Sequence, residues 1–325
     1  EMRLRKIAYA LFIIATICLF TSCKKECKHQ SIEWVIDKQA TCTEEGIEHE
    51  ECTKCHEKFD IKEIKKLKHI CNDEGICTIC GNKVATSGLI YKLNEDKKSY
   101  YVSEYIGIDI DIIIPAKYDG LYVTSIGDSA FSNFIGLTSI EIPNSVTSIG
   151  LTAFSYCTDL TSIIIPDSVI NIGLFAFDSC SKLSEIKLSN NLTNIGNSAF
   201  SDTAYYNNDL NWENDMLYIG KYLLNAKKDI AGSRTVKKGT KLIADAAFLS
   251  CKNLTDITIP NSVINIGENA FNGCSGLKNL TIPNSVTSIG DFAFSNCTQL
   301  TNVTVSDSVI SIGAFTFGYY TTDDF

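Results

Sequence analysis

Several residue types that enzymes depend on are scarce in this sequence. Its 325 residues include only four histidines, and none of them follows His69. Most of the chain therefore lacks the commonest general base in enzymes. The motifs G-x-S-x-G, H-E-x-x-H and G-x-x-x-x-G-K, which mark hydrolase, metalloprotease and nucleotide-phosphate sites, are also absent. These absences disfavour an enzyme.

Basic charge is in short supply as well. The chain has 29 lysines and arginines against 38 aspartates and glutamates, which gives a formal net charge of -9. Proteins that bind nucleic acid usually carry a strong basic patch or stripe. We therefore expect no nucleic-acid partner. The 45% of hydrophobic residues is ample for a packed core.

The first 22 residues have the pattern of an export signal. A basic start is followed by an uncharged apolar run over residues 7–20, which is typical of a secretory signal and short for a membrane-spanning helix. Thr21 and Ser22 directly before Cys23 resemble a bacterial lipobox, although Phe20 stands where that motif usually has leucine. The resemblance implies acylation of Cys23 and an exported, membrane-anchored lipoprotein at the cell surface. An ordinary signal peptide or an uncleaved anchor are the alternatives.

Residues 23–85 form a second segment that is rich in cysteine and histidine. Two C-x-x-C pairs stand 21 residues apart, just past the usual zinc-ribbon spacing. Because thiolates and imidazoles suit tetrahedral zinc, a structural zinc site is one interpretation. The primary candidate ligands are Cys52, Cys55, Cys77 and Cys80, and the further candidates are Cys27, His29, His69 and Cys71.

Disulfides are the rival interpretation of this segment, since an exported protein meets an oxidising compartment. Seven of its cysteines remain once Cys23 is acylated, and an odd number cannot pair fully. Redox activity is the third alternative. The stretch from Ala40 to Cys55 resembles small cysteine-rich modules that accompany repeats in bacterial surface proteins.

A short repeat of constant length dominates the rest of the chain. An Ile-Gly step followed four residues later by phenylalanine recurs in phase, and an eighth copy has Ala244 in place of glycine. The glycines are Gly127, Gly150, Gly173, Gly196, Gly267, Gly290 and Gly313. Between Gly196 and Ala244 the pattern is lost while about two repeat lengths are kept. Residues 203–243 are called the interruption below.

One repeat unit predicts a short coil. Ile140 and Ile142 alternate with polar residues, so they share one face of a strand, and Pro143 then ends its pairing. We expect Gly150 to permit a sharp bend at positive φ. A turn or a single helical turn around Phe154 then closes the coil. No unit buries its apolar stripe alone, so stacking of successive units supplies the core.

The full pattern L-x-x-I-x-I-P-x-S-V-x-x-I-G-x-x-A-F-x-x-C resembles the BspA-like leucine-rich-repeat surface antigens over residues 106–317. The resemblance implies a curved, right-handed solenoid with short parallel strands on a bacterial surface, and adhesion to host or microbial partners. We expect a capping hairpin and first strand over residues 86–119 and a mainly β solenoid over residues 120–325. The interruption is interpreted as irregular coils or a projecting hairpin.

One column of the repeat holds cysteine in most copies. Phenylalanine, threonine and tyrosine occupy the same position in other copies, which indicates a packing slot and not a reactive thiol. The column consists of Cys157, Cys180, Cys251, Cys274 and Cys297.

The predicted function is a protein-binding or adhesion scaffold. Polar positions between the core positions of the first strand vary from unit to unit and are free to contact a partner. Exposed aromatics of the interruption would add affinity, although their rings would fill the core in the alternative interpretation. The candidate binding residues are Glu141, Lys187, Asp256, Asn279, Trp212 and Tyr218.

The expected partners are extracellular or host-matrix proteins or other bacterial surfaces. The lipid anchor is expected to be the only membrane contact, and structural zinc the only cofactor. A structural or periplasmic display protein without an adhesive role is the competing function. An enzyme would need chemistry hidden in the interruption.

Overall fold

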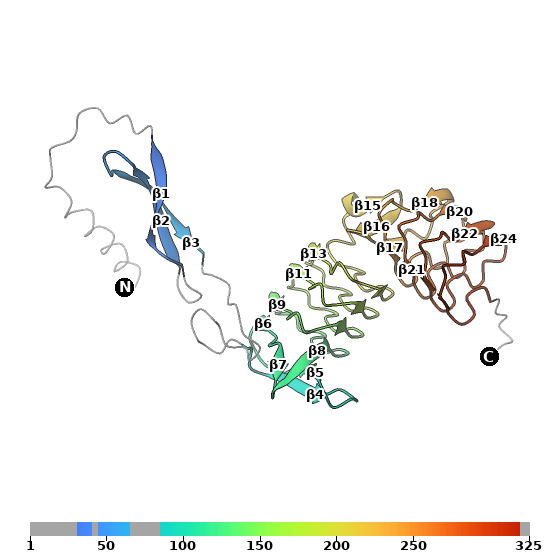
Figure 1. The fold of residues 1–325 in the computed structure, drawn as a ribbon, viewed down its shortest axis with the longest axis horizontal. Helices are drawn as coiled ribbons and strands as arrows, with labels where there is room; N and C mark the ends of the chain where they lie inside the picture. The colour runs from blue at the N-terminus through green and yellow to red at the C-terminus, as the bar shows by residue number, and fades with distance from the viewer. Residues whose placement is uncertain (1–30, 41–44, 66–84, 319–325) are drawn as a thin grey trace. The chain divides into compact units, whose positions relative to one another are not determined.

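The computed structural model describes residues 31–40, 45–65 and 85–318, which fall into two units (Figure 1). The described residues are mainly β and contain no α-helix, so none of them forms a helix that could cross a membrane. The first unit is an antiparallel sheet of β1 (Ile32–Lys38), β2 (Gly46–Cys52) and β3 (Lys58–Ile64), in that order. The second unit is a parallel-strand solenoid of about nine turns.

Each coil of the solenoid contributes two short strands. In the coils before the interruption the first strands are β6 (Asp111–Ile113), β9 (Ser139–Glu141), β11 (Ser162–Ile164) and β13 (Glu185–Lys187). The second strands are β8 (Leu121–Ile126), β10 (Ser148–Ile149), β12 (Asn171–Ile172) and β14 (Asn194–Ile195). Equivalent residues of successive repeat units pair in parallel, as Ile149 does with Ile172. One repeat length in the sequence therefore becomes one step along the sheet.

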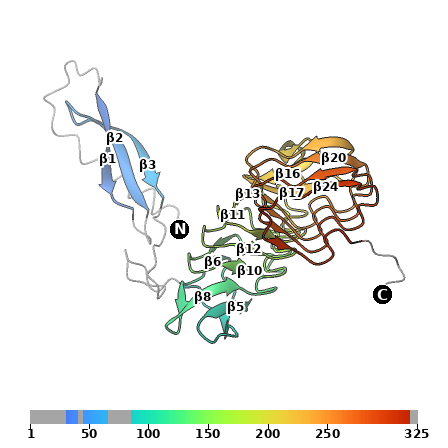
Figure 2. The same ribbon diagram turned by 45° about the vertical axis from the view of Figure 1, so that its right-hand side comes forward.

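The coils from residue 232 onward, which include the last part of the interruption, repeat this plan. Their first strands are β18 (Gly232–Thr235), β20 (Leu254–Thr258), β22 (Asn279–Thr281) and β24 (Asn302–Thr304). Their second strands are β19 (Leu242–Ile243), β21 (Asn265–Ile266), β23 (Ser288–Ile289) and β25 (Ser311–Ile312). Figure 2 shows β20 and β24 on the same side of this half.

A hairpin covers the N-terminal edge of the solenoid. It consists of β4 (Leu89–Leu93) and β5 (Tyr100–Tyr105), and β5 pairs in parallel with β8. The short strand β7 (Lys117–Tyr118) pairs with β8 as well. Val102 in β5 is fully buried. The hairpin therefore closes the core and also pairs an edge strand that would otherwise be open to other chains.

Stacked side chains of the repeat form the core. Phe154 is fully buried, and so are Leu137 and Ile149 from the same coil. Burial of each such side chain stabilises the fold by roughly 1.5–3 kcal/mol relative to exposure. The core therefore grows by one equivalent layer with each coil.

A ladder of backbone hydrogen bonds closes each coil where turns follow the glycine. The amides two, four and six residues after the glycine donate to carbonyls one, three and five residues after the next glycine. Phe131 N, for example, donates to Ala153 O at 2.8 Å, and Phe154 N to Ala176 O at 2.7 Å. This segment, called the turn ladder below, consists of turns and not of a helical turn.

The structural reason for the recurring glycines differs from the one predicted from the sequence. Gly150 and its equivalents do not lie at positive φ, whereas Thr152 (49°) and Tyr156 (61°) do. A Cβ on Gly173 would stand 2.6 Å from the carbonyl carbon of Gly150. The expectation of positive φ is thus wrong, because what requires glycine is the close approach of the neighbouring coil.

The interruption contains a 3-10 helix, η1 (Asp209–Asn211), followed by β15 (Trp212–Glu213), β16 (Met216–Ile219) and β17 (Tyr222–Ala226). β16 and β17 form an antiparallel hairpin, and β17 pairs in parallel with β19. All four residues of β16 are buried. Leu217 and Ile219 belong to the core of the preceding coils, whereas Met216 and Tyr218 belong to that of the following coils. This hairpin does not project, because it separates two cores.

Candidate functional site

The first strands present the predicted binding residues on their outward positions. Lys187 in β13 and Asn279 in β22 are exposed, and Glu141 in β9 and Asp256 in β20 are half-buried. Each alternates with core residues such as Ile140 and Ile163. This outward surface of β6, β9, β11, β13, β18, β20, β22 and β24 is called the strand face below.

The strand face is not one continuous sheet. Glu141 lies in the β6–β9 pair and Lys187 in the β11–β13 pair, whereas Asp256 and Asn279 share the sheet β18-β20-β22-β24. The structure therefore brings Asp256 and Asn279 together and leaves the other two candidates on separate strand pairs. A partner that contacts all four residues would have to span several sheets.

A ladder of side-chain hydrogen bonds runs along the continuous part of the strand face. Asn279 donates through Nδ2 to Asp256 Oδ1 at 3.1 Å, and Asn302 donates to Asn279 Oδ1 at 2.9 Å. These bonds restrict the rotamers of three side chains on the strand face before a partner arrives, which lowers the entropy lost on binding. Asn302 stands one repeat length after Asn279, in the same column of variable positions that the sequence assigns to the binding face.

The two aromatic candidates in the interruption have different environments. Trp212 is half-buried and donates through Nε1 to Tyr206 O at 2.8 Å. Its ring meets that of Tyr206 edge-on at 5.2 Å, and Lys227 Nζ lies 5.5 Å from the ring centroid. Trp212 therefore lines an accessible surface while remaining anchored.

Tyr218 is a core residue with 6% of its surface exposed. Its hydroxyl donates to Met216 Sδ at 3.4 Å and accepts from Lys237 N at 3.1 Å. Burial raises the pKa of this hydroxyl. The expectation that Tyr218 is an exposed aromatic is thus wrong, because β16 is covered on both faces.

Only one of the two C-x-x-C pairs lies within the described residues. Cys52 is fully buried at the end of β2, and Cys55 is half-buried in the turn that follows. The described residues contain no cluster of three or more histidine, cysteine or acidic side chains that could hold a metal. The other candidates, Cys27, His29, His69, Cys71, Cys77 and Cys80, and the lipidation candidate Cys23 lie outside the described residues.

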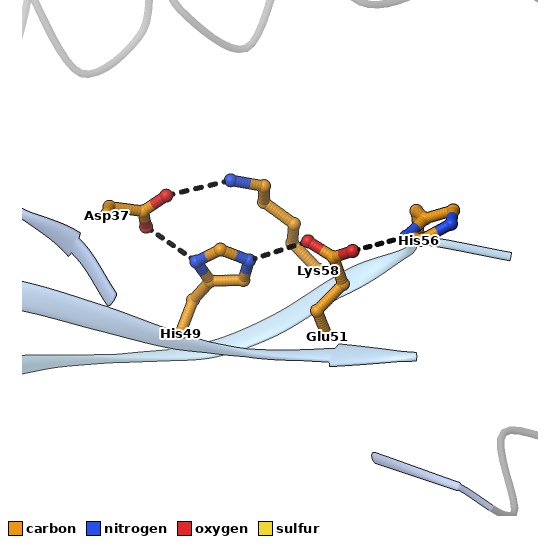
Figure 3. A network of polar contacts seen from close by, with 5 residues as sticks. All are labelled: Asp37, His49, Glu51, His56 and Lys58. Atoms are coloured by element: carbon orange, nitrogen blue, oxygen red, sulfur yellow. Dashed lines mark hydrogen bonds and ion pairs between the residues drawn. The ribbon is translucent and has the colours of Figure 1, made fainter. Parts of the chain in front are cut away.

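A polar network beside this pair centres on His49 (Figure 3). The ring is 1% exposed, with Nδ1 at 2.6 Å from Asp37 Oδ2 and Nε2 at 3.2 Å from Glu51 Oε2. Lys58 Nζ contacts Asp37 at 3.0 Å, and His56 contacts Glu51. Hydrogen bonds from Lys58 and then His49 lower the pKa of Asp37, and those from His56 and then His49 lower the pKa of Glu51.

This network has a structural role and was not anticipated from the sequence. Carboxylates occupy both ring nitrogens of His49, so neither nitrogen is free to bind a metal in this arrangement. The contacts tie β1 to β2 across a small unit whose other side chains are largely exposed.

Four cysteines of the repeat column are buried and Cys297 is half-buried, as a packing slot predicts. Cys157 donates through Sγ to Phe131 O at 3.1 Å, and Cys180 donates to Phe154 O at 3.0 Å. Burial raises the pKa of Cys251 to about 11. Because the thiolate is the reactive species, burial makes Cys251 a poor nucleophile at neutral pH.

The comparisons with known proteins agree with this architecture. The family model "BspA type Leucine rich repeat region" matches residues 111–231 and 233–323, with six copies. No curated protein matches the chain.

Several solved structures resemble the chain. A leucine-rich repeat protein of T. pallidum is 25% identical, with 72% of this chain and 88% of that chain covered and a TM-score of 0.35. A leucine-rich cell surface protein of Faecalibacterium prausnitzii A2-165 is 24% identical, with 72% and 73% covered and a TM-score of 0.34. The pneumococcal vaccine antigen PcpA is 14% identical, with 74% and 88% covered and a TM-score of 0.29.

Proposed function

The chain belongs to the BspA-type leucine-rich-repeat family, and on that premise we propose that its solenoid is a protein-binding scaffold that mediates adhesion at the bacterial cell surface. Its partners are extracellular or host-matrix proteins or the surfaces of other bacteria. The comparisons indicate no catalytic family, and the described solenoid contains no histidine, so the proposed role is binding without catalysis.

The strand face is the observation that carries this proposal. It presents in-register columns of polar side chains on a rigid, fully packed core, with the ladder from Asp256 to Asn302 already ordered. Threonines occupy the adjacent column at Thr235, Thr258, Thr281 and Thr304. With strands about 4.8 Å apart, successive coils provide room for a standard interface of about 800 Å² per partner.

The chemistry of this face favours modest affinity for each copy. Hydroxyls and amides form hydrogen bonds that replace bonds to water, so each contributes only about 0.5–1.5 kcal/mol net. Many copies of the scaffold on one cell would multiply that affinity through avidity.

Anchoring at the membrane completes the proposal. Acylation at Cys23 would hold the protein on the cell, because several acyl chains together anchor firmly at about 0.8 kcal/mol for each buried CH₂. The change Cys23→Ser should release the protein or leave it unprocessed. A mature Cys23→Ser protein that stays in the membrane would contradict this anchor.

The direct test of the binding role uses the purified full chain on surfaces coated with fibronectin, laminin or collagen, and on other bacteria. Saturable binding to at least one of these, together with loss of binding after added protease removes the solenoid from intact cells, is the expected result. A solenoid that protease cannot reach on intact cells, and that binds no protein partner, would favour a display protein without adhesive role.

A further inference from the structure

The turn ladder is broken at one place. In the coils that begin at Gly127, Gly150, Gly173, Ala244, Gly267 and Gly290, all three donor amides bond to the next coil. After Gly196 the corresponding amides belong to Ser198, Phe200 and Asp202, and none of them donates a hydrogen bond to any described residue. The next coil is shortened here. Leu223 stands in the position of the repeat isoleucine, and Ala226 resumes the ladder by donating to Ala247 O. Only two residues separate Leu223 from Ala226.

A pocket of about 550 Å³ lies at this break. Ser198 and Ser201 line it from the coil before the interruption, and Ala246 and Leu249 from the coil after it. Its volume falls within the range of small-molecule sites, about 300–1,000 Å³. The pocket therefore occupies the place where a full-length coil would have continued the ladder.

Residues of the interruption supply the rest of the lining. The rings of Tyr206 and Trp212 form an aromatic corner. Asn225 and Tyr206 line the same pocket, and neither the side-chain amide of Asn225 nor the hydroxyl of Tyr206 forms a hydrogen bond with a described residue. Two polar side chains without a hydrogen-bond partner among the described residues thus line the same space as the aromatic corner.

The charges of the lining balance. Lys227 and Lys228 face Asp209 and Asp229, and Lys227 Nζ contacts Asp209 Oδ1 at 3.3 Å. A balanced site has no net attraction for an anion or a cation. The many amides and hydroxyls disfavour an apolar ligand, because their hydrogen-bonding groups would be left unpaired.

The backbone geometry disfavours a peptide strand as the occupant. Ser198 and Asp202, four residues apart on the open edge, both have φ of 55° and lie in the left-handed region. A peptide that continued this ladder would need left-handed residues at the same four-residue spacing, and residues other than glycine and asparagine rarely adopt that conformation. A ligand without a peptide backbone avoids that penalty.

We propose that this pocket binds a neutral saccharide of one or two rings. Each sugar hydroxyl both donates and accepts, which matches the open amide of Ser198, the amide of Asn225 and the hydroxyl of Tyr206. The C–H face of a sugar ring packs against an aromatic ring, the role assigned to Trp212. This site is separate from the strand face and does not depend on the adhesive role proposed above.

Tryptophan fluorescence tests the proposal on the full chain. The sequence has only two tryptophans, Trp34 and Trp212, so the change Trp34→Phe leaves Trp212 as the sole reporter. Cellobiose, maltose, lactose and diacetylchitobiose are the probes. At least one should change the fluorescence saturably with a Kd of about 1 mM or lower, and inorganic phosphate should not.

Two variants place the site. Asn225→Ala should weaken binding about tenfold, because it leaves a buried sugar hydroxyl unpaired, and Tyr206→Phe should weaken it several-fold while keeping the ring. Asn302→Ala, on the strand face, is the matched control and should bind as the parent does. The proposal is overturned if no probe acts up to about 50 mM, well above the expected Kd, if phosphate alone binds, or if both pocket variants bind unchanged.

Discussion

The rings of Phe154 and Phe177 lie parallel, with centroids 5.0 Å apart and 6° between their planes, although they belong to different repeat units. Both rings are fully buried. The same relationship links Phe131 to Phe154 and Phe177 to Phe200. In the coils from Phe131 to Phe200, one side chain per coil thus forms an aromatic column, and each ring inside it contacts a neighbour on both sides.

Removal of one ring from this column should destabilise the solenoid strongly. Phe154→Ala leaves a cavity between Phe131 and Phe177 that the regular backbone cannot close, so we expect a loss of about 3–5 kcal/mol in the free energy of unfolding. Chemical denaturation followed by circular dichroism measures it. Thr281→Ala, an exposed change on the strand face, is the control and should stay within about 0.5 kcal/mol. Equal losses for the two variants would contradict a core built on this column.

Gly173→Ala should be poorly tolerated for a steric reason. Its Cβ would stand 2.6 Å from the carbonyl carbon of Gly150, so two coils would have to move apart. We expect a loss of about 1–3 kcal/mol or more, as for other overpacked sites. Gly136→Ala is the matched control, because its Cβ would meet nothing closer than Ile110 at 3.5 Å. If thermal melts show the two variants to be equally stable, close coil contact is not the reason for glycine.

The carboxyl of Asp245, which lies at the junction between the two halves of the solenoid, should make the free energy of unfolding depend on pH. Its Oδ1 accepts from Glu268 N at 2.8 Å, and its own amide donates to Ile195 O at 3.0 Å. Burial raises the pKa of this carboxyl from 3.8 to about 6. Between these values the folded state binds more protons than the unfolded state, so this carboxyl's contribution to stability is lost as pH rises through about 6.

Asp245→Asn should remove that dependence. The variant gains stability relative to the parent as pH rises from 4 to 7, by at most about 3 kcal/mol, which is the equivalent of the raised pKa. Asp291→Asn is the control, because exposed Asp291 accepts from Ala314 N at the same repeat position. Urea denaturation at pH 4, 5, 6 and 7 measures both variants. If the difference in free energy of unfolding between Asp245→Asn and the parent does not grow with pH, the raised pKa of Asp245 is refuted.

Structural zinc in residues 23–85 remains a prediction from the C-x-x-C pairs. Elemental analysis of the reduced full chain should find zinc, and Cys55→Ser should lower its content, whereas Cys251→Ser in the solenoid should not. Chelation should unfold the small unit and leave the solenoid intact, because metal binding supplies folding free energy only where the ligands lie. Absence of metal, with six of the seven thiols paired, would establish the disulfide alternative.

The regular part of the fold was predictable because it depends on residues that recur at the same position of each repeat unit. The recurrence of Ile149, Gly150 and Phe154 at the same places in successive repeat units indicates which side chains stack, and the family resemblance implies the same solenoid. The cysteine column followed from the same reasoning, since its position also accepts phenylalanine.

The structure departs from the sequence predictions where contacts with neighbouring coils, and not the local sequence, determine the conformation. The reason for Gly150 depends on the distance to another coil, which one unit does not reveal. Met216 to Ile219 are four consecutive apolar residues, a pattern typical of strands buried on both faces, and that signal would have placed Tyr218 in the core. The open amides after Gly196 depend on a shortened coil, which only the hydrogen-bond pattern locates.

Binding of the purified full chain to immobilised extracellular-matrix proteins, measured by surface plasmon resonance, tests the adhesive scaffold most directly. The decisive variant changes Glu141, Lys187, Asp256 and Asn279 to alanine together. The control changes Thr147 and Thr193 to alanine, exposed residues that directly precede the second strands β10 and β14, and Trp212→Phe is measured separately. The account predicts that the fourfold variant loses at least about tenfold in affinity, equivalent to about 1.4 kcal/mol, while the control binds as the parent does. Unchanged binding of a folded fourfold variant to every partner that the parent binds would contradict it.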